Sequence, residues 1–358
     1  MRITQLQLKS FRCFDLLDLS FDAPLMVIEG ANGVGKTSLL EAFHFLCYLR
    51  SFRTHLPQEL MKFGHESFFI KAILEDGHDT NELQVGFNNK KRLVKINNKS
   101  VASYKELLQY YRIVTLTEDD LALIKEGPEL RRLFIDQVIA LWDADFMAIL
   151  KKCRDVTIQR NALLKNGGSL DSYTLWTDQL WQTTFLIQEK RSTALTALEQ
   201  EIRELVQEYF KDAFSITFTY TPKKSLLSSV DEFKKVNSYL YHNEQRFGRS
   251  LFGAHLDDFT INFQDTLCKQ YASRGQQKLI IVLLKAAQIL LLKKQGRPAI
   301  LLLDDFITDF DEHNAQILLT LLQNLGIQLI FTIPSLSGQG FLQKELKARG
   351  GSFLKLPG

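Results

Sequence analysis

The sequence predicts an α/β protein whose parallel sheet is assembled from both ends of the chain, with a helical insertion between them. Continuously apolar segments, typical of strands covered on both faces, occur near the N-terminus at 25–28 and near the C-terminus at 299–305 and 327–333. Helical patterns alternate with these segments, which is the order expected of a parallel sheet. The middle of the chain is helical over much longer stretches.

The N-terminal part is expected to contain several strands around one buried helix. Residues 17–21 alternate apolar and polar positions, as a half-buried strand does. The segment 37–49 is apolar almost all round, which indicates a helix covered on every side. Residues 68–74 and 83–96 have the composition of further strands, the second with a turn near Asn88.

Two long helices joined by a tight turn are predicted in the middle of the chain. Between Pro128 and Pro222 the strong turn signal is Asn-Gly-Gly-Ser at 166–169. We therefore expect helices at 129–165 and 171–210 that pair as an antiparallel hairpin. The hairpin either projects as an arm or packs as a compact helical subdomain, and the pattern leaves both open.

After the insertion, the chain returns to mixed structure. A strand is expected at 261–263 and helices at 274–294 and 312–325, in addition to the apolar strands already named. These patterns predict an N-terminal head segment, a helical insert and a C-terminal head segment, with bounds at 1–128, 129–248 and 249–358.

Composition limits the classes of protein that the chain can belong to. Its 358 residues carry a net charge of only +3, so a nucleic-acid partner would have to be met by a local basic patch. The four cysteines form no CxxC pair, which argues against a disulfide scaffold and fits a reducing compartment. The N-terminus has no signal-peptide pattern, and the most apolar run, 279–292, contains Lys285 and is shorter than a membrane span. We expect a cytoplasmic protein with no membrane partner.

The segment GANGVGKT at 30–37 is the strongest motif. It matches G-x-x-x-x-G-K-[ST], follows an apolar strand and opens a helix. In such a loop, glycines let backbone N–H groups surround a phosphate, and the helix N-terminus adds partial positive charge. The lysine would reach the β- and γ-phosphates of ATP, and the threonine hydroxyl would bind Mg²⁺. The candidate nucleotide-binding residues here are Gly30, Ala31, Asn32, Gly33, Val34, Gly35, Lys36 and Thr37.

A second half of this site is predicted where the strand 299–305 ends. Asp304 would hold Mg²⁺ together with Thr37, directly or through water, and Asp305 would orient or deprotonate an attacking water. Taken alone, the pair is more commonly an ordinary Asp-Asp turn after a strand. With the lysine of the P-loop it forms the candidate catalytic set Lys36, Asp304 and Asp305. Most of the chain separates Lys36 from Asp304, so the insertion is expected to split one nucleotide-binding fold.

A third motif stands just before the predicted helix 274–294. Ser273, Gly275 and Gln276 have the form of the signature motif of ABC-type ATPases, in which a serine hydroxyl and glycine N–H groups at a helix start grip the γ-phosphate held by another subunit. Taken alone, Ser273 is more commonly a helix cap. Its place upstream of the Asp-Asp strand and downstream of a P-loop favours the signature.

Taken together, these segments resemble the RecF recombination mediators, which are related to the SMC-type ATPases. The resemblance covers nearly the whole chain and is carried by FRCF (11–14), the P-loop, SFRT (51–54), EDDLALIKEGPELRRLFID (118–136), GAHLDD (253–258), SRGQQK (273–278) and LLLDD (301–305). It implies an ABC/SMC-type P-loop ATPase head assembled from the N- and C-terminal segments, with the helical hairpin as an inserted arm domain. The chain departs from the family pattern at Glu118, Glu126, Ala254, Leu256 and 308–311.

The resemblance also implies a function. It implies ATP and Mg²⁺ as cofactors, an ATP-dependent homodimer that binds DNA at gaps, and weak DNA-dependent ATP hydrolysis that acts as a switch. RecO and RecR are implied as partners in loading RecA during repair, replication and the SOS response. The alternative is a nucleotide-responsive scaffold with negligible hydrolysis. A transporter ATPase is disfavoured, because Thr332 stands where a switch histidine is expected and the P-loop lies too far from the signature.

Two groups of basic residues are candidates for DNA contacts. No acid occurs between Glu82 and Glu106, and Lys90, Lys91 and Arg92 lie in this basic stretch. On a hairpin several of them would share a face and could neutralise phosphates; the alternative is an edge hairpin whose lysines prevent aggregation. Arg50 and Arg53, which follow the P-loop helix, are the better candidates because they lie near the predicted nucleotide site.

Overall fold

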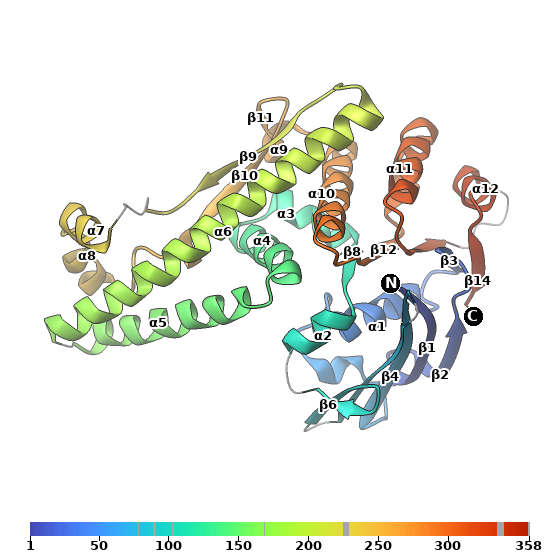
Figure 1. Cartoon of the computed structure of the whole chain (residues 1–358), viewed down its shortest axis with the longest axis horizontal. Coiled ribbons are helices and arrows are strands. Elements are labelled where there is room, and N and C mark those ends of the chain that lie inside the picture. Colours follow the sequence, from blue (N-terminus) through green and yellow to red (C-terminus); the bar gives the residue numbers. More distant parts are fainter. Residues whose placement is uncertain are drawn as a thin grey trace. The chain divides into compact units, whose positions relative to one another are not determined.

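The computed structural model describes residues 1–77, 79–88, 91–101, 104–167, 169–224, 229–334 and 340–356. The chain divides into two compact units, drawn in Figure 1. Unit 1 consists of Met1–Leu121 and Arg274–Gly358, and unit 2 of Ala122–Ser273. The expectation that one α/β unit is assembled from both ends of the chain is therefore confirmed.

A five-stranded parallel sheet carries the predicted site residues of unit 1. Its strand order is β14-β3-β13-β12-β8, and every neighbouring pair is parallel. The strands are β3 (Leu25–Gly30), β8 (Ile113–Leu116), β12 (Ile300–Asp304), β13 (Leu329–Pro334) and β14 (Ser352–Lys355). The apolar patterns predicted β3, β12 and β13. They did not predict β8 and β14, because runs of four residues carry too little pattern to recognise.

A second sheet in unit 1 is antiparallel, with the order β2-β1-β4-β5-β6-β7. Its strands are β1 (Arg2–Phe11), β2 (Phe14–Ser20), β4 (Ser67–Asp76), β5 (Asp79–Asn88), β6 (Lys91–Ile96) and β7 (Lys99–Ser100). The strands expected at 17–21, 68–74 and 83–96 are confirmed as β2, β4 and the β5–β6 pair. The turn expected at residues 88 and 89 falls partly outside the described residues.

Helix α1 (Lys36–Tyr48) contacts strands of both sheets, namely β3, β8 and β12 of the parallel sheet and β5 of the antiparallel one. This placement explains why its sequence is apolar on every side, since a helix covered all round has no solvent face. The predicted helix 37–49 is thus confirmed, and its N-terminus is held in the core of unit 1.

The other helices of unit 1 lie in its C-terminal segment or are short. They are α2 (Tyr104–Tyr110), α10 (Arg274–Lys294), α11 (Glu312–Asn324) and α12 (Phe341–Ala348), with the 3₁₀ turns η1 (Pro57–Leu60), η2 (Glu118–Leu121) and η4 (Phe306–Asp309). Within the described ranges, α10 is the one helix long and apolar enough to cross a membrane, but 78% of its most apolar window is buried inside the protein. It is therefore a core helix, as the presence of Lys285 within its apolar run indicated.

Unit 2 pairs a helical hairpin with a small antiparallel sheet. Its helices are α3 (Ala122–Lys125), α4 (Pro128–Trp142), α5 (Phe146–Asn166), α6 (Leu170–Phe210), α7 (Val230–Val236), α8 (Leu240–Phe247) and α9 (Cys268–Tyr271), with η3 at Ala254–Leu256. The sheet has the order β11-β10-β9, from Thr266–Leu267, Asp258–Phe263 and Ile216–Thr221. Helices α5 and α6 lie side by side, and α6 also contacts α4 and β9, so the predicted hairpin is confirmed and packs within its own unit (Figure 1).

The expected single helix over 129–165 is wrong: it is two helices, α4 and α5, separated at residues 143–145. Asp143 has a non-helical backbone, and its side chain accepts a hydrogen bond from the Asp145 N–H at 3.1 Å. Short acidic side chains compete in this way with the backbone hydrogen bonds of a helix. Lys190 of α6 binds Asp143 at 2.7 Å and fixes the break.

Residues 249–273 lie in unit 2, whereas the sequence-based division placed them in the C-terminal head segment. The reason is strand pairing, because β10 pairs antiparallel with β9 from Asp258–Thr221 to Phe263–Ile216. The return of the chain to unit 1 therefore comes at Arg274, where α10 begins.

Candidate nucleotide-binding site

The P-loop is the connection between β3 and α1. Gly33 and Gly35 have φ of +86° and +105°, in the left-handed region that favours glycine. A Cβ on Gly35 would lie 2.5 Å from Cys13 Sγ and 2.7 Å from Phe14 Cζ, whereas nothing lies within 4 Å of one on Gly33. The loop is thus in close contact with Cys13 and Phe14 at Gly35, whereas the space around Gly33 is open. Ala31, Asn32 and Gly33 are exposed, as residues that cradle a phosphate must be.

Lys36 is the first residue of α1 and is only 6% exposed. Its ammonium donates hydrogen bonds to the Gly30 carbonyl at 2.9 Å and the Ala31 carbonyl at 3.3 Å, and lies 3.9 Å from Asp305 Oδ2. The lysine therefore places a positive charge against the inner side of the loop. Thr37, the next residue, is half-buried beside it.

The acidic half of the site lies at the carboxyl edge of the same sheet. β13 separates β3 from β12, and Thr332 of β13 is in register with Ile28 on one side and Asp304 on the other. The Thr332 hydroxyl donates to Asp304 Oδ1 at 2.8 Å and accepts from the Asp305 N–H at 3.1 Å. Strands far apart in sequence thus bring Lys36, Asp304 and Asp305 together, as the motifs required.

Burial raises the pKa of the Asp305 carboxyl, and the neighbouring Asp304 adds to the rise while Lys36 opposes it. A carboxylate with a raised pKa is a stronger base. Asp305 also has φ of 48°, a left-handed conformation that aspartate tolerates better than most residues. Asp305 therefore combines a raised pKa with an unusual backbone conformation at the end of the acid strand.

The donor set fits a hydrated magnesium ion held partly by phosphate oxygens. Among the described residues, no group of three or more His, Cys, Asp or Glu side chains could hold a metal ion alone. Mg²⁺ is usually bound by one or two protein oxygens plus substrate phosphates and water, which the Thr37 hydroxyl and the Asp304 carboxylate could provide.

An ion pair with a buried carboxylate lies on α1, the helix that follows the P-loop, and the sequence motifs did not predict it. Arg12 binds the fully buried Glu41 of α1 through two nitrogens, at 2.7 and 2.6 Å, and donates to the Glu59 carbonyl at 2.7 Å. The hydrogen bonds that Arg12 donates to the Glu41 carboxylate raise the pKa of Arg12. Ser51 also donates to Glu41. One residue of FRCF and one of SFRT therefore bind Glu41. The sequence signal that could have revealed this contact is a single acidic residue in a mostly apolar helix.

The predicted signature is presented at the start of α10. Ser273, Arg274 and Gly275 are exposed and Gln276 is half-buried. Nothing lies within 4 Å of a Cβ built on Gly275, so this glycine leaves open space at the helix start. An exposed, donor-rich helix N-terminus suits a phosphate brought by another molecule.

Two further motif segments meet each other in unit 2. Arg131 binds both oxygens of Asp258 at 2.7 and 3.0 Å, and Arg132 donates to the Asp257 carbonyl at 2.7 Å. Arg191 of α6 binds both oxygens of Asp136 at 2.8 and 2.9 Å. Residues of 131–136 and 257–258 thus hold α4, α6 and the sheet of unit 2 together.

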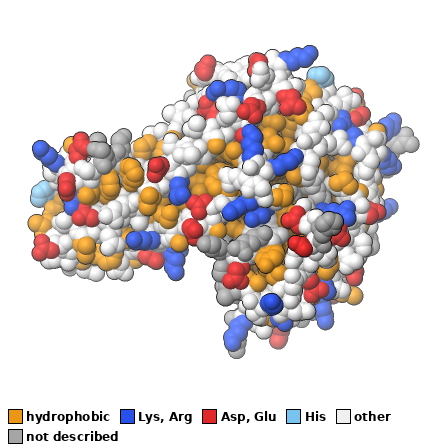
Figure 2. Space-filling model, viewed as in Figure 1, with side chains coloured by type: hydrophobic (Ala, Val, Ile, Leu, Met, Phe, Trp, Pro, Cys, Tyr) orange, Lys and Arg blue, Asp and Glu red, His pale blue; other side chains and the backbone are white. Residues whose placement is uncertain are grey.

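The candidate DNA contacts do not form one surface. Lys91 and Arg92 are neighbours on β6 and point to opposite faces, since successive strand residues alternate. Arg92 donates to the Leu49 carbonyl at 2.8 Å, next to Arg50, whereas Lys90 lies outside the described residues. Arg50 and Arg53 are exposed. On the face drawn in Figure 2, basic and acidic side chains are interspersed, in agreement with the low net charge.

Comparisons with known proteins agree with this geometry. The family model "RecF/RecN/SMC N terminal domain" matches residues 2–343. DNA replication and repair protein RecF of Leptospira interrogans serovar copenhageni is 30% identical over 99% of this chain and 97% of its own length. RecF of Halalkalibacterium halodurans is 30% identical over 94% of both.

Solved structures show the same fold. The recombination mediator protein RecF-ATPrS in the RecFOR pathway has a TM-score of 0.81 and 25% identity over 94% of this chain and 93% of that one. An SMC head bound to the C-winged helix domain of ScpA has a TM-score of 0.54 at 15% identity, which shows the ABC/SMC-type head fold alone. From the P-loop, the acid pair, the full-length relatives and the family model, the chain belongs to the RecF family of DNA replication and repair proteins.

Proposed function

We propose that the chain is an ATP-gated DNA clamp of recombinational repair, with unit 1 as the ATPase head and unit 2 as the arm. The observation that carries the proposal is the meeting of Lys36, Asp304 and Asp305 at one sheet edge, while the signature is exposed on α10. One chain can thus offer half of an ATP site, and the signature of a second copy can offer the other half. Two copies would then associate head to tail.

The P-loop, the acids and the signature have different roles in the proposed ATP site. Lys36 and the P-loop N–H groups bind the phosphates, and Thr37 and Asp304 hold Mg²⁺. Asp305 orients or deprotonates a water, for which its raised pKa suits it. Ser273 and Gly275 of the second copy donate hydrogen bonds to the same γ-phosphate. Because the γ-phosphate binds well only in the assembled state, ATP favours the dimer and its hydrolysis releases it.

DNA binding, RecO and RecR partnership and RecA loading at gaps are part of the same proposal. Its support is the similarity to a recombination mediator protein RecF described in the RecFOR pathway. Within this chain, Arg50, Arg53 and Arg92 are the cations that lie around the end of α1. They would place DNA at the C-terminal end of the helix whose N-terminus forms the P-loop, so that α1 links the nucleotide to the DNA contacts.

Light scattering with and without Mg-ATP tests the proposal. We expect the wild-type chain to be monomeric without ATP and dimeric with it, and the Lys36→Met chain to stay monomeric in both. Asp305→Asn should bind ATP but hydrolyse it slowly, and so remain trapped as a dimer. A chain that does not dimerise with ATP contradicts the clamp, and an Asp305→Asn chain that behaves as wild type favours the scaffold alternative.

A further inference from the structure

Lys278 is a lysine of α10 that is buried in unit 1. Its side chain is only 2% exposed, and its ammonium forms an ion pair with Glu118. The same ammonium lies 4.8 Å from the centroid of the Phe306 ring. A charge in the interior is costly unless it is paired, and both of these neighbours stabilise the buried ammonium.

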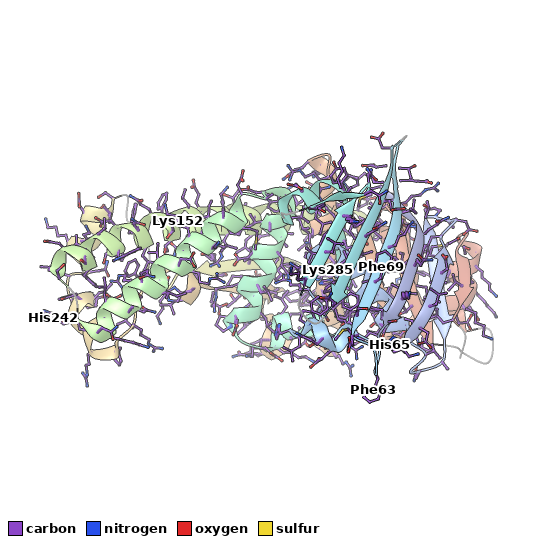
Figure 3. All side chains as sticks on the ribbon, turned by 90° about the horizontal axis from the view of Figure 1, so that it is seen from below. Phe63, His65, Phe69, Lys152, His242 and Lys285 are labelled. Carbon is purple, nitrogen blue, oxygen red and sulfur yellow. The ribbon has the colours of Figure 1, made fainter. Side chains whose placement is uncertain are left out.

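The two neighbours of Lys278 follow two adjacent strands of the parallel sheet. Glu118 begins η2 one residue after β8, and Phe306 directly follows Asp305 after β12. A second lysine of α10, Lys285 (labelled in Figure 3), binds Asp120 of η2 at 2.7 Å, and Arg274 at the start of the helix pairs with Glu118 at 3.5 Å. Helix α10 is therefore attached to η2 through three of its cations, and Lys278 extends this attachment to the loop after the acids.

Phe306 is the chain neighbour of Asp305, whose N–H is also bound by the Thr332 hydroxyl. The Phe306 side chain is buried, and Asp305 is held at φ of 48° between it and β12. A non-glycine residue stays in this region only where its surroundings hold it. A displacement of the Phe306 ring would therefore move Asp305 as well.

We propose that Lys278 is a positioning residue that couples the start of α10, with Ser273 and Gly275, to the loop that carries Asp305 in the same chain. This inference rests on the proposed head-to-tail dimer. In that dimer, the acids of a chain would contact one ATP, and the signature of the same chain would contact the second ATP. Lys278 therefore makes the two ATP sites respond to each other through the body of each chain.

A complementation assay separates this coupling from a local effect on α10. A Ser273→Arg chain supplies the P-loop and acids, and a Lys36→Met chain supplies the signature. Each is expected to be inactive alone, and their mixture should contain one working site. Lys278→Met, which keeps the length and apolar stem but removes the charge, is then placed in one chain or the other.

We expect ATP hydrolysis by the mixture to fall about tenfold whichever chain carries Lys278→Met. Lys278→Arg should restore most of the activity, because it keeps the cation. Lys293→Met is the matched control, since Lys293 is on the same helix but bonds to the Leu325 carbonyl at 2.9 Å. Full activity with Lys278→Met in the chain that supplies the acids would overturn the coupling.

Hydrogen exchange of the isolated chain tests the same link without a dimer. Lys278→Met should speed amide exchange several-fold both at the start of α10 and around Phe306, and Lys293→Met should speed neither. Unchanged exchange around Phe306 contradicts the role of Lys278. An inactive mixture of the Ser273→Arg and Lys36→Met chains, by contrast, contradicts the head-to-tail dimer of the proposed function.

Discussion

At the scale of single residues, Thr332 shows how much one hydroxyl can organise. It is buried on the strand between the P-loop strand and the acid strand, and it bonds to Asp304 and to the backbone of Asp305. A threonine cannot act as an acid or base near neutral pH, so its contribution is to place the two carboxylates. Its position in the middle of three parallel strands makes this possible.

Thr332→Val should therefore lower ATP turnover by about tenfold while nucleotide binding changes little. The valine has a similar shape but leaves the Asp305 N–H without its acceptor. Steady-state hydrolysis and fluorescent-nucleotide binding measure the two effects. Thr320→Val is the matched control, because the exposed Thr320 hydroxyl donates to the Gln316 carbonyl at 2.8 Å and accepts from Arg349 at 3.0 Å, and neither partner belongs to the ATP site. Unchanged turnover in Thr332→Val would contradict the placement role.

His44 gives a second residue-scale prediction. Burial lowers the pKa of His44 to about 3, with smaller contributions from Arg50 and Lys285. The ring lies 3.0 Å from the Thr115 hydroxyl and is neutral in the fold. Because the folded pKa is below the unfolded one, the stabilisation is complete above the ordinary histidine pKa. It is lost as pH falls from there towards 3.

His44→Gln should remove this part of the acid sensitivity. Between pH 7 and pH 5, the wild type should lose about 2 kcal/mol more unfolding free energy than the variant. Urea unfolding at the two pH values measures it. His242→Gln, at an exposed histidine (Figure 3), should leave the wild-type pH dependence in place. Equal pH dependence in His44→Gln and the wild type would show that His44 is not held neutral.

At the scale of elements, the hairpin of unit 2 is held by a buried ion pair. Arg160 of α5 has no exposed surface and binds both oxygens of Glu244 in α8, at 2.9 and 2.6 Å. It also bonds to Tyr173, Thr177 and Ser250. One guanidinium on α5 thus binds side chains of both α6 and α8 and joins the three helices.

Arg160→Met should destabilise unit 2 by about 3–5 kcal/mol, because Glu244 is left as an unpaired buried charge. Thermal and urea unfolding measure the loss. Arg154→Met is the control on the same helix, since Arg154 forms an exposed pair with Asp155 at 3.7 Å and such pairs contribute about 0–1 kcal/mol. A loss below 1 kcal/mol in Arg160→Met would show that the ion pair does not hold the hairpin.

At the scale of the whole molecule, the net charge of +3 means that the proposed DNA binding would depend on local basic surfaces. Each lysine or arginine that contacts a phosphate releases counterions, so the logarithm of affinity falls linearly with the logarithm of salt. Arg50→Ala and Arg53→Ala should each weaken ATP-dependent DNA binding and reduce this slope by about one. Arg154→Ala, on α5, is the control. A slope that neither substitution reduces would remove these residues from the DNA surface.

The local sequence was sufficient for the elements whose pattern is long or chemically specific. Helix α6 follows from its unbroken periodicity, α1 from its all-round apolar character, and the P-loop from glycines that the observed backbone requires at Gly33 and Gly35. The break between α4 and α5 was missed, because it depends on Lys190 and on the side chain of Asp143.

What the sequence by itself determined is the chemistry of the site: a phosphate loop, two acids at a strand end and a donor-rich helix start. Only the tertiary structure decided which of these groups touch. Strand order places Thr332 between the strand that leads into the P-loop and the strand that carries the acids, and helix packing buries Lys278 against Glu118 and Phe306. The physical reason is that motifs depend on backbone conformation and residue type, which are local, whereas hydrogen bonds between strands and buried charges depend on neighbours from distant parts of the chain.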